Sequence, residues 1–221
     1  IIDPFKKLAW EFSRFKRLPD GEPYCTTFNI WDLTGPGQGI PYDGLRWVTR
    51  GGRGSGFPEI AGLIRPEEVE AGEIRHAMVF GFPHNRKGED GGLWFVGPAS
   101  RSDGMYIGDQ YPYEGAHLQL DPSLTDEDFN KMGLGPSAKV VARALQKYGM
   151  FLGDNSSNLT ISMQVLDPAA EKSRAEWEKR CPGIYNDMKK IPTSLFRVLD
   201  YGTVHKQPPG VEDAFKASRP V

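Results

Sequence analysis

The chain has 221 residues, a formal net charge of −2 and a sequence pI of about 6.1. This balance provides no global positive field, so DNA and RNA are not expected partners. Apolar residues make up 38% and charged residues 25%, which excludes a disordered or fibrous chain, and no apolar run approaches the roughly 20 residues that a membrane-spanning helix needs.

Taken in chain order, the pattern predicts many short strands and a few helices. Strands are expected over 8–14, 24–33, 73–82, 93–96 and 116–120, then a hairpin of 150–153 with 159–166, and a last strand over 195–199. Capping residues and apolar spacing predict helices over 66–71, from 125, over 136–148 and over 167–179. The expected fold class is mainly β, a β-sandwich or jelly roll with two to four peripheral helices.

A single β-rich domain is expected over 1–206, followed by a surface-wrapping or frayed tail over 207–221. The chain opens on two isoleucines that resemble the end of a strand, so we expect an upstream piece to be missing. The sequence does not indicate an oligomeric state.

Two features indicate an extracellular, secreted protein. Asn155 and Asn158 each begin an Asn-x-Ser/Thr tripeptide, which is the acceptor pattern for N-glycosylation. Cys25 and Cys181 are the only cysteines, and a disulfide between them is the simplest use of the pair. Two buried free thiols are the alternative.

Several side chains are candidates for catalysis. Glycoside hydrolysis needs a protonated and an ionised carboxyl group close together, and Glu11, Asp32, Asp103 and Asp154 are the candidates for this pair. An Asp in a turn often caps its own backbone instead. His76 is expected on the apolar side of the 73–82 strand, where an imidazole could act as a general base or be an ordinary core histidine.

Other side chains are candidates for binding a substrate. Trp31 and Trp47 offer flat faces that suit sugar rings, although indoles more often belong to a core. His117 and Gln119 share one face of the 116–120 strand, which could line a cleft or be solvated, and Arg101 lies in a polar turn. The sequence contains no phosphate loop, nucleophile elbow or zinc motif, and its two cysteines are not closely spaced, so no metal ligand set is predicted.

Five segments of the chain are similar to segments of other proteins: 61–65 (AGLIR), 72–80 (GEIRHAMVF), 98–104 (PASRSDG), 118–123 (LQLDPS) and 143–150 (RALQKYGM). Through them the chain resembles a widespread group of uncharacterised secreted microbial proteins over about residues 10–155. The resemblance implies secretion and a β-rich fold, and it brings no activity with it.

The leading hypothesis is a secreted carbohydrate-active enzyme that cleaves a polysaccharide, using a carboxyl pair or His76. One alternative is a lectin-like domain that binds carbohydrate without catalysis. Another is a polysaccharide lyase with His76 or Tyr148 as base and an anionic substrate near Arg50, Arg53 or Arg101. No cofactor is expected apart from calcium, for which the loop 103–109 is a candidate although its spacing fits no defined calcium loop.

Overall fold

The computed structural model describes residues 1–25, 27–35 and 52–207. Among the described residues 23% are helical and 25% are in strands, so the class is mixed α/β, with several small sheets of mixed direction. Many short strands and several helices are present, as the sequence pattern predicts, but the content is mixed rather than clearly mainly β. No helix among the described residues is long and apolar enough to cross a membrane.

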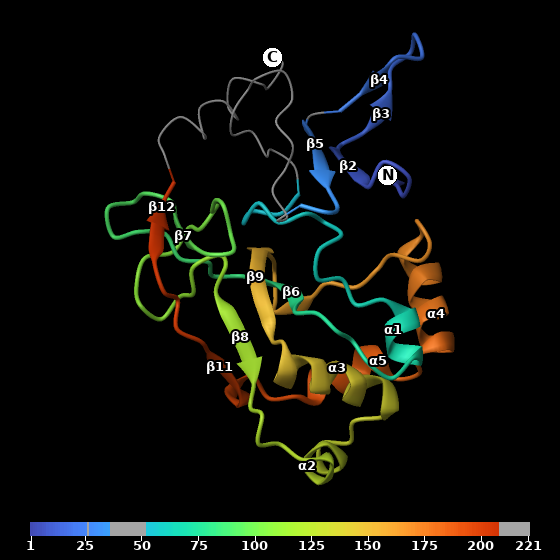
Figure 1. Ribbon diagram of the computed structural model, residues 1–221, viewed down its shortest axis with the longest axis vertical. Helices are drawn as coiled ribbons and strands as arrows, with labels where there is room; N and C mark the ends of the chain where they lie inside the picture. Colours follow the sequence, from blue (N-terminus) through green and yellow to red (C-terminus); the bar gives the residue numbers. More distant parts are fainter. Residues whose placement is uncertain (26, 36–51, 208–221) are drawn as a thin grey trace.

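A five-stranded sheet lies at the centre of the molecule (Figure 1). Its order is β10 (Thr160–Ile161), β6 (Met78–Phe82), β9 (Met150–Asn155), β8 (His117–Leu120) and β11 (Phe196–Val198). The pair β6 and β9 is parallel, and the other pairs are antiparallel. The carboxyl ends of β6 and β9 therefore meet at one edge of this sheet, where the candidate site lies.

Smaller sheets hold the remaining strands of the described part of the chain. One has the order β1-β2-β5, and the others are the pairs β3 with β4 and β7 with β12. The strand bounds are Ile2–Asp3 for β1, Leu8–Ser13 for β2, Lys16–Arg17 for β3, Pro23–Tyr24 for β4, Thr27–Asp32 for β5, Trp94–Val96 for β7 and Val204–Lys206 for β12. In Figure 1 the sheet of β1, β2 and β5 lies at the opposite end of the molecule from α2.

Four of the five α-helices of the described residues lie where the sequence predicts them, whereas the helix Ile184–Asp187 was not predicted. The helix predicted from residue 167 begins at Ala170, without a side-chain cap. The helix bounds are Pro66–Glu70 for α1, Asp126–Lys131 for α2, Pro136–Lys147 for α3, Ala170–Arg180 for α4 and Ile184–Asp187 for α5, with short 3₁₀ turns at Met188–Lys190 and Thr193–Leu195. The capping box at the start of α2 is confirmed: the Thr125 hydroxyl accepts a hydrogen bond from the Asp128 backbone N–H, and the Asp128 carboxylate accepts one from the Thr125 backbone.

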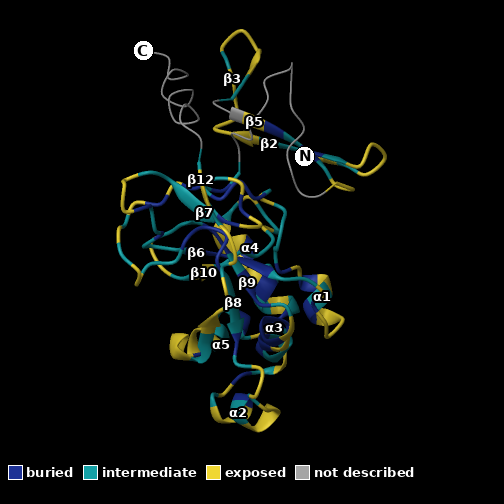
Figure 2. Cartoon of the chain, turned by 60° about the vertical axis from the view of Figure 1, so that its left-hand side comes forward, coloured by how far each residue is buried: buried dark blue, intermediate teal, exposed yellow. Residues whose placement is uncertain are grey.

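One large core lies between the five-stranded sheet and the helices (Figure 2, dark blue). Fully buried side chains from β6, β8, β9, α3 and α4 meet there, among them Phe80, Leu120, Leu145, Leu152 and Trp177. This burial fixes the sheet, because apolar area removed from water is the main favourable term in folding.

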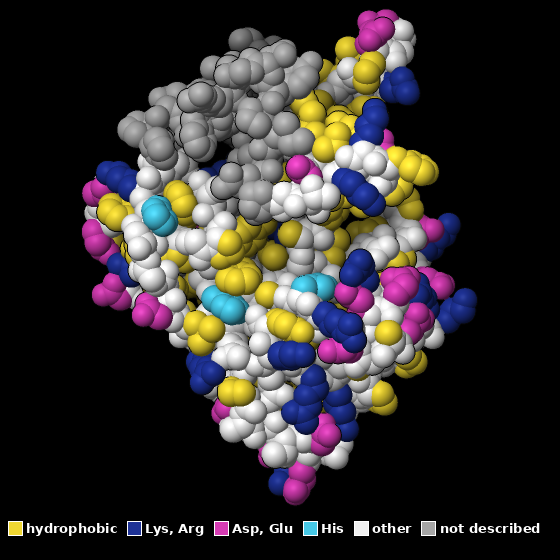
Figure 3. All heavy atoms as spheres, viewed as in Figure 1, with side chains coloured by type: hydrophobic (Ala, Val, Ile, Leu, Met, Phe, Trp, Pro, Cys, Tyr) yellow, Lys and Arg dark blue, Asp and Glu magenta, His cyan; other side chains and the backbone are white. Residues whose placement is uncertain are grey.

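The surface differs between the two ends of the molecule. Figure 3 shows acidic and basic side chains interspersed over α1, α3 and α4, which is typical of a solvated helical surface. Apolar side chains are more frequent over β2 and β5, where Phe12 and Phe28 stack with ring centroids 6.5 Å apart and are each 39% exposed.

The predicted strands differ from the structure in several places, and β3, for example, was not predicted. The expected hairpin does not form, because β10 and β9 both pair with β6, which lies between them. Gly81 permits this crossing, since a Cβ there would lie 2.9 Å from the Cβ of Ser156 in the connecting segment. The strand expected from residue 73 begins only at Met78, and β12 was not predicted at all.

The predicted disulfide is not formed. Cys25 and Cys181 are both free thiols. Cys25 lies between β4 and β5, whereas Cys181 is buried at the end of α4 with its sulfur facing the Pro66 carbonyl oxygen at 4.0 Å. The two segments lie in different parts of the fold (Figure 1), so Cys181 acts as a small apolar core residue.

Candidate functional site

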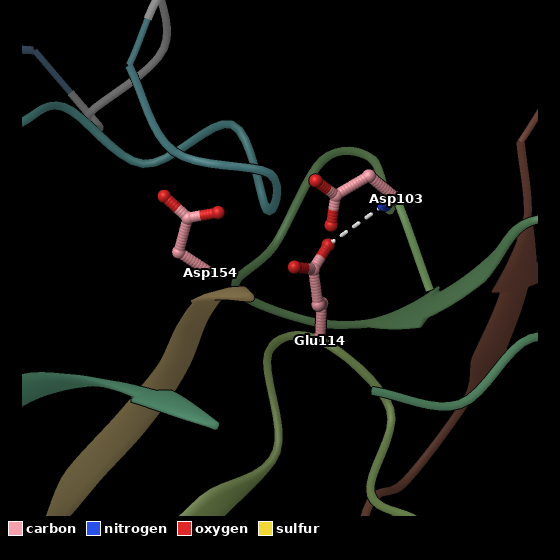
Figure 4. A group of neighbouring side chains, drawn as sticks. All are labelled: Asp103, Glu114 and Asp154. Atoms are coloured by element: carbon pink, nitrogen blue, oxygen red, sulfur yellow. Dashed lines mark hydrogen bonds between the residues drawn. The ribbon is translucent and has the colours of Figure 1, made fainter. Parts of the chain in front are cut away.

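Three carboxyl groups from separate segments converge beside the end of β9 (Figure 4). Asp154 belongs to β9, Asp103 to a loop after β7, and Glu114 to the segment just before β8. An oxygen of each lies within 4.8 Å of an oxygen of each of the others. We call these three residues the carboxyl cluster.

Glu114 lies at the bottom of the cluster and has no exposed surface. Its backbone is held against β7, where the Val96 N–H donates to the Glu114 carbonyl oxygen at 2.9 Å. The next residue, Gly115, has φ +88°, and a Cβ there would lie 1.9 Å from the Val96 carbonyl oxygen, so only glycine fits. The side-chain oxygens of Glu114 accept hydrogen bonds from the Asn85 amide at 3.0 Å and the Asp103 backbone N–H at 3.1 Å.

The two aspartates lie nearer to solvent and are fixed by Asn155. The Asn155 side-chain amide donates to the Asp103 carboxylate at 2.6 Å and to its carbonyl oxygen at 3.1 Å. The Asn155 backbone N–H donates to the Asp154 carboxylate at 2.8 Å, and the Gly54 N–H is a second donor to Asp154. One residue thus orients both carboxylates.

The surroundings of the cluster favour retained protons. Burial raises the pKa of Glu114 well above its ordinary value, and the charge of Asp103 adds to this. Burial, again with the charge of Asp103, also raises the pKa of Asp154. The Arg101 guanidinium interacts electrostatically with all three carboxyl groups and partly compensates their charge. Glu114 and Asp154 therefore each keep a proton to higher pH than an ordinary carboxyl group of their kind does.

An open hollow of about 230 Å³ borders the cluster at Asp154. Its walls are mostly polar and come from the edge of the central sheet and from the segment before α1; the lining residues are Arg53, Glu59, Val79, Phe80, Gly81, Asp154, Asn155, Ser156, Thr160 and Ser162. A small polar ligand placed here would contact the carboxyl group of Asp154 directly.

The cluster could also hold a divalent cation, since carboxylate oxygens are the preferred ligands of calcium and magnesium. The predicted calcium loop 103–109 contributes only its first residue, Asp103, to this group. Asp109 instead forms an ion pair with Arg86 at 2.6 Å. A cation at this place would thus be held by Asp103, Glu114 and Asp154 rather than by one loop.

Two predicted catalytic carboxylates lie outside the cluster. Glu11 is half-buried, its carboxylate accepts a hydrogen bond from the Glu59 N–H at 2.6 Å, and burial raises its pKa. Its link to the cluster is electrostatic, because the Arg53 guanidinium interacts with both Glu11 and Asp154. Asp32 caps its own turn by accepting hydrogen bonds from the backbone and hydroxyl of Thr34, which lower its pKa. These contacts give Asp32 a structural role.

The predicted histidine base is not part of the cluster either. His76 lies in the irregular segment before β6, with one ring nitrogen 3.2 Å from the Glu68 carboxylate and the other 2.9 Å from the Ala77 carbonyl oxygen. On β8, His117 contacts the Tyr148 carbonyl oxygen at 2.8 Å, and Gln119 donates to the Gln146 carbonyl oxygen at 2.7 Å. These bonds fix side chains between β8 and α3.

The predicted sugar-binding residues are separated by the fold. Trp31 is 1% exposed, so its ring presents no face to a ligand and the prediction for this residue is wrong. Trp47 and Arg50 lie outside the described residues. Arg101 does lie at the cluster, where it also donates to the Arg53 carbonyl oxygen at 2.8 Å.

The two predicted glycosylation sites differ in their surroundings. Both hydrogens of the Asn155 amide are used toward Asp103, so a glycan on this nitrogen would disturb the cluster. Asn158 is exposed in the loop before β10, and glycosylation there stays a prediction.

Sequence reasoning missed Glu114 and its partner Asn85. The sequence signal for Glu114 was weak: a charged residue followed by one glycine, just ahead of the strand predicted over 116–120, within Tyr-Pro-Tyr-Glu-Gly (111–115). Comparison of the chain with protein-family models, with curated proteins and with solved structures gives no match. Its function is therefore argued from the site itself.

The buried Glu114 leads to a prediction about stability. In the unfolded chain this group ionises near its ordinary pKa of 4.5, whereas the folded protein keeps the proton to higher pH. The free energy of unfolding of the native protein should therefore fall as pH rises above about 4.5, by up to about 1.4 kcal/mol per pH unit, until Glu114 ionises in the fold as well. Glu114→Gln removes this loss, so the variant should gain stability relative to the native chain between pH 4.5 and 7.5.

Urea unfolding at both pH values checks this, with the exposed Glu127→Gln as the matched control. The glutamine side chain created by this substitution can still bond to Asn85 if the Asn85 side-chain amide flips by 180°. The flip costs no existing bond of the Asn85 side-chain oxygen, which has no partner among the described residues. A Glu114→Gln variant that loses more stability at pH 7.5 than at pH 4.5 would show that Glu114 is ionised in the fold.

Proposed function

We propose that this protein is a secreted carbohydrate-active enzyme that hydrolyses a glycosidic bond with Asp154 and Asp103. The observation that carries the proposal is the carboxyl cluster itself: two solvent-reachable carboxyl groups, one with a raised pKa, held together over a third that is buried. A β-sandwich or jelly-roll scaffold is part of the same proposal, in which β10-β6-β9-β8-β11 would be one layer.

Each carboxyl group has a role that fits its surroundings. Asp154 would act as the general acid, because its raised pKa keeps the proton that the leaving oxygen needs. Asp103 would act as the nucleophile, since it is exposed and its position is fixed by the Asn155 amide. Glu114 is buried and is a positioning residue, because its carboxyl group accepts a hydrogen bond from the Asp103 backbone N–H.

The proposed reaction proceeds in two steps. Asp154 donates its proton to the glycosidic oxygen as the bond from that oxygen to the anomeric carbon breaks, and the Asp103 carboxylate forms an ester with that carbon. Asp154, now ionised, takes a proton from water, which attacks the same carbon and releases Asp103. Both residues return to their starting states.

The short separation of the two groups predicts the stereochemistry. Retaining glycosidases place their carboxyl groups about 5 to 5.5 Å apart, whereas inverting enzymes need about 6.5 to 9.5 Å to admit a water. One oxygen of each group lies within 4.8 Å of one oxygen of the other, which is nearer the retaining separation, so we expect the first product to keep the anomeric configuration of the substrate. The hollow is smaller than the roughly 300 Å³ at the lower end of typical ligand pockets, which fits one sugar unit at a time.

The test is incubation with a panel of plant, fungal and bacterial glycans, followed by assay of new reducing ends and ¹H NMR of the fresh anomer. New reducing ends with retained configuration are expected from at least one glycan. Products that absorb in the ultraviolet would replace the proposal with the lyase alternative. Glycan binding without new reducing ends would replace the proposal with a lectin-like function. If the protein neither binds nor cleaves any glycan, the hydrolase, lyase and lectin hypotheses are all wrong.

A further inference from the structure

A group of four aromatic rings lies beside the carboxyl cluster. His84 is its centre, with ring centroids 4.7 Å from Tyr106, 5.8 Å from Tyr111 and 5.9 Å from Phe82. Tyr106 and Tyr111 also contact each other at 5.2 Å. All four residues are intermediate in burial, so none is fully enclosed in the core. We call these four residues the aromatic platform.

The platform is tied to the carboxyl cluster by backbone and side-chain bonds. Phe82 is paired in register with Asn155, the residue that orients both aspartates. The Tyr106 N–H donates to the Asn85 carbonyl oxygen at 3.1 Å, and the Asn85 side chain donates to Glu114. The two groups are therefore neighbours in the fold.

The Arg86 guanidinium near the platform is paired with carboxylates. Arg86 follows the platform residue His84 by two positions, and its guanidinium contacts Asp109 at 2.6 Å and Glu89 at 3.3 Å. Exposed apolar side chains flank the rings, since Met105 is 59% and Ile107 46% exposed. A paired cation and an apolar rim suit a neutral ligand with an apolar face better than an anionic one.

We propose that the aromatic platform is a subsite that holds a neutral sugar unit of the glycan whose bond is cut at the carboxyl cluster. The inference rests on the proposed function, because it takes the ligand class from it. Sugar rings carry apolar C–H faces that pack on aromatic rings, and the tyrosine hydroxyls can bond to sugar hydroxyls at the rim. The platform would set which glycan is bound, while the carboxyl groups carry out the cleavage.

The experiment measures binding apart from catalysis. Asp154→Asn protein is titrated by calorimetry with cello-, xylo-, manno-, laminari-, malto- and chitohexaose. At least one hexaose should bind, and adding Tyr106→Ala or Tyr111→Ala should weaken that binding about tenfold. Tyr106→Phe, which keeps the ring, should stay within about twofold of the parent. Tyr24→Ala, which removes a half-buried ring from β4, is the matched control, and a thermal melt confirms that each variant is folded.

The outcomes separate this proposal from the proposed function. Binding that is lost in the tyrosine variants supports the platform even if the native protein cleaves no glycan, in which case only the hydrolytic function fails. A different result is that the native protein cleaves a glycan while folded Tyr106→Ala and Tyr111→Ala protein keep kcat/KM within about twofold of the native value. That result overturns the platform and leaves the hydrolytic function standing. If no hexaose binds, or if binding survives both substitutions, the platform is overturned as well.

Discussion

Replacing Asp154 by Asn is expected to lower kcat on the cleaved glycan by about 10² to 10⁴-fold, the range typical of losing a general acid. The amide keeps the size of the side chain, and its carbonyl oxygen can still accept from the N–H groups of Gly54 and Asn155. What it lacks is a proton that can be transferred to the leaving oxygen. KM should change little, because the substitution leaves the hollow and its other lining residues in place.

Asp121→Asn is the control for this variant. Asp121 is also an aspartate with a hydrogen-bonded carboxylate, but its bonds go to Ser123 within its own turn after β8. That variant should keep native kinetics. Full activity in folded Asp154→Asn protein would exclude Asp154 as the acid and with it the proposed mechanism.

The second large effect is expected from Gly54→Ala. Gly54 does not have a positive φ, so its backbone suits alanine, but a Cβ there would lie 2.4 Å from the Asp103 carboxylate and 2.7 Å from the Glu114 carboxylate. The backbone at this residue approaches the carboxyl cluster so closely that only a hydrogen fits. The added methyl group must push these carboxyl groups away, and a misplacement of about 1 Å in an active site can cost about 10²-fold in rate.

Gly54→Ala should therefore lose about 10²-fold in kcat/KM and about 1 to 3 kcal/mol in the free energy of unfolding, as expected for overpacking. Gly35→Ala is the comparison, because a Cβ there would be at an ordinary distance of 3.4 Å from the nearest side chain and φ is not positive. Rates are measured well below the unfolding transition of each variant. Native kcat/KM in Gly54→Ala protein would mean that the carboxyl cluster is not where the chemistry occurs.

Local signals predicted the elements of the fold well. The Thr125 cap, the Pro136 start of α3 and the strand β2 all depend on residues within one turn or one strand, and all are confirmed. Strand pairing was harder to predict, because it depends on contacts between segments that are far apart in the sequence. The parallel contact of β6 with β9 joins segments about 70 residues apart, and local periodicity cannot reveal it.

The candidate site was predicted only in part for the same reason. Asp103 and Asp154 could be selected as carboxylates in turn-like sequence, but nothing local indicates that Asn155 links them or that Arg101 lies beside them. Glu114 was missed because its burial results from the packing of β7 and β9 around it. The bonds that Glu11 and His76 form within other parts of the fold are likewise set by tertiary contacts.

The proposed chemistry depends most directly on protons retained by the carboxyl cluster. Its sharpest test is a ¹³C NMR titration of the side-chain carboxyl groups in metal-free protein, assigned with Glu114→Gln and Asp154→Asn. We expect that Glu114 titrates well above its ordinary value of 4.5 and that Asp154 titrates above its ordinary value of 3.8. Titration of both groups at or below their ordinary values would contradict this. Signals that shift to the ionised form on adding calcium would contradict it too and would identify the cluster as a cation site.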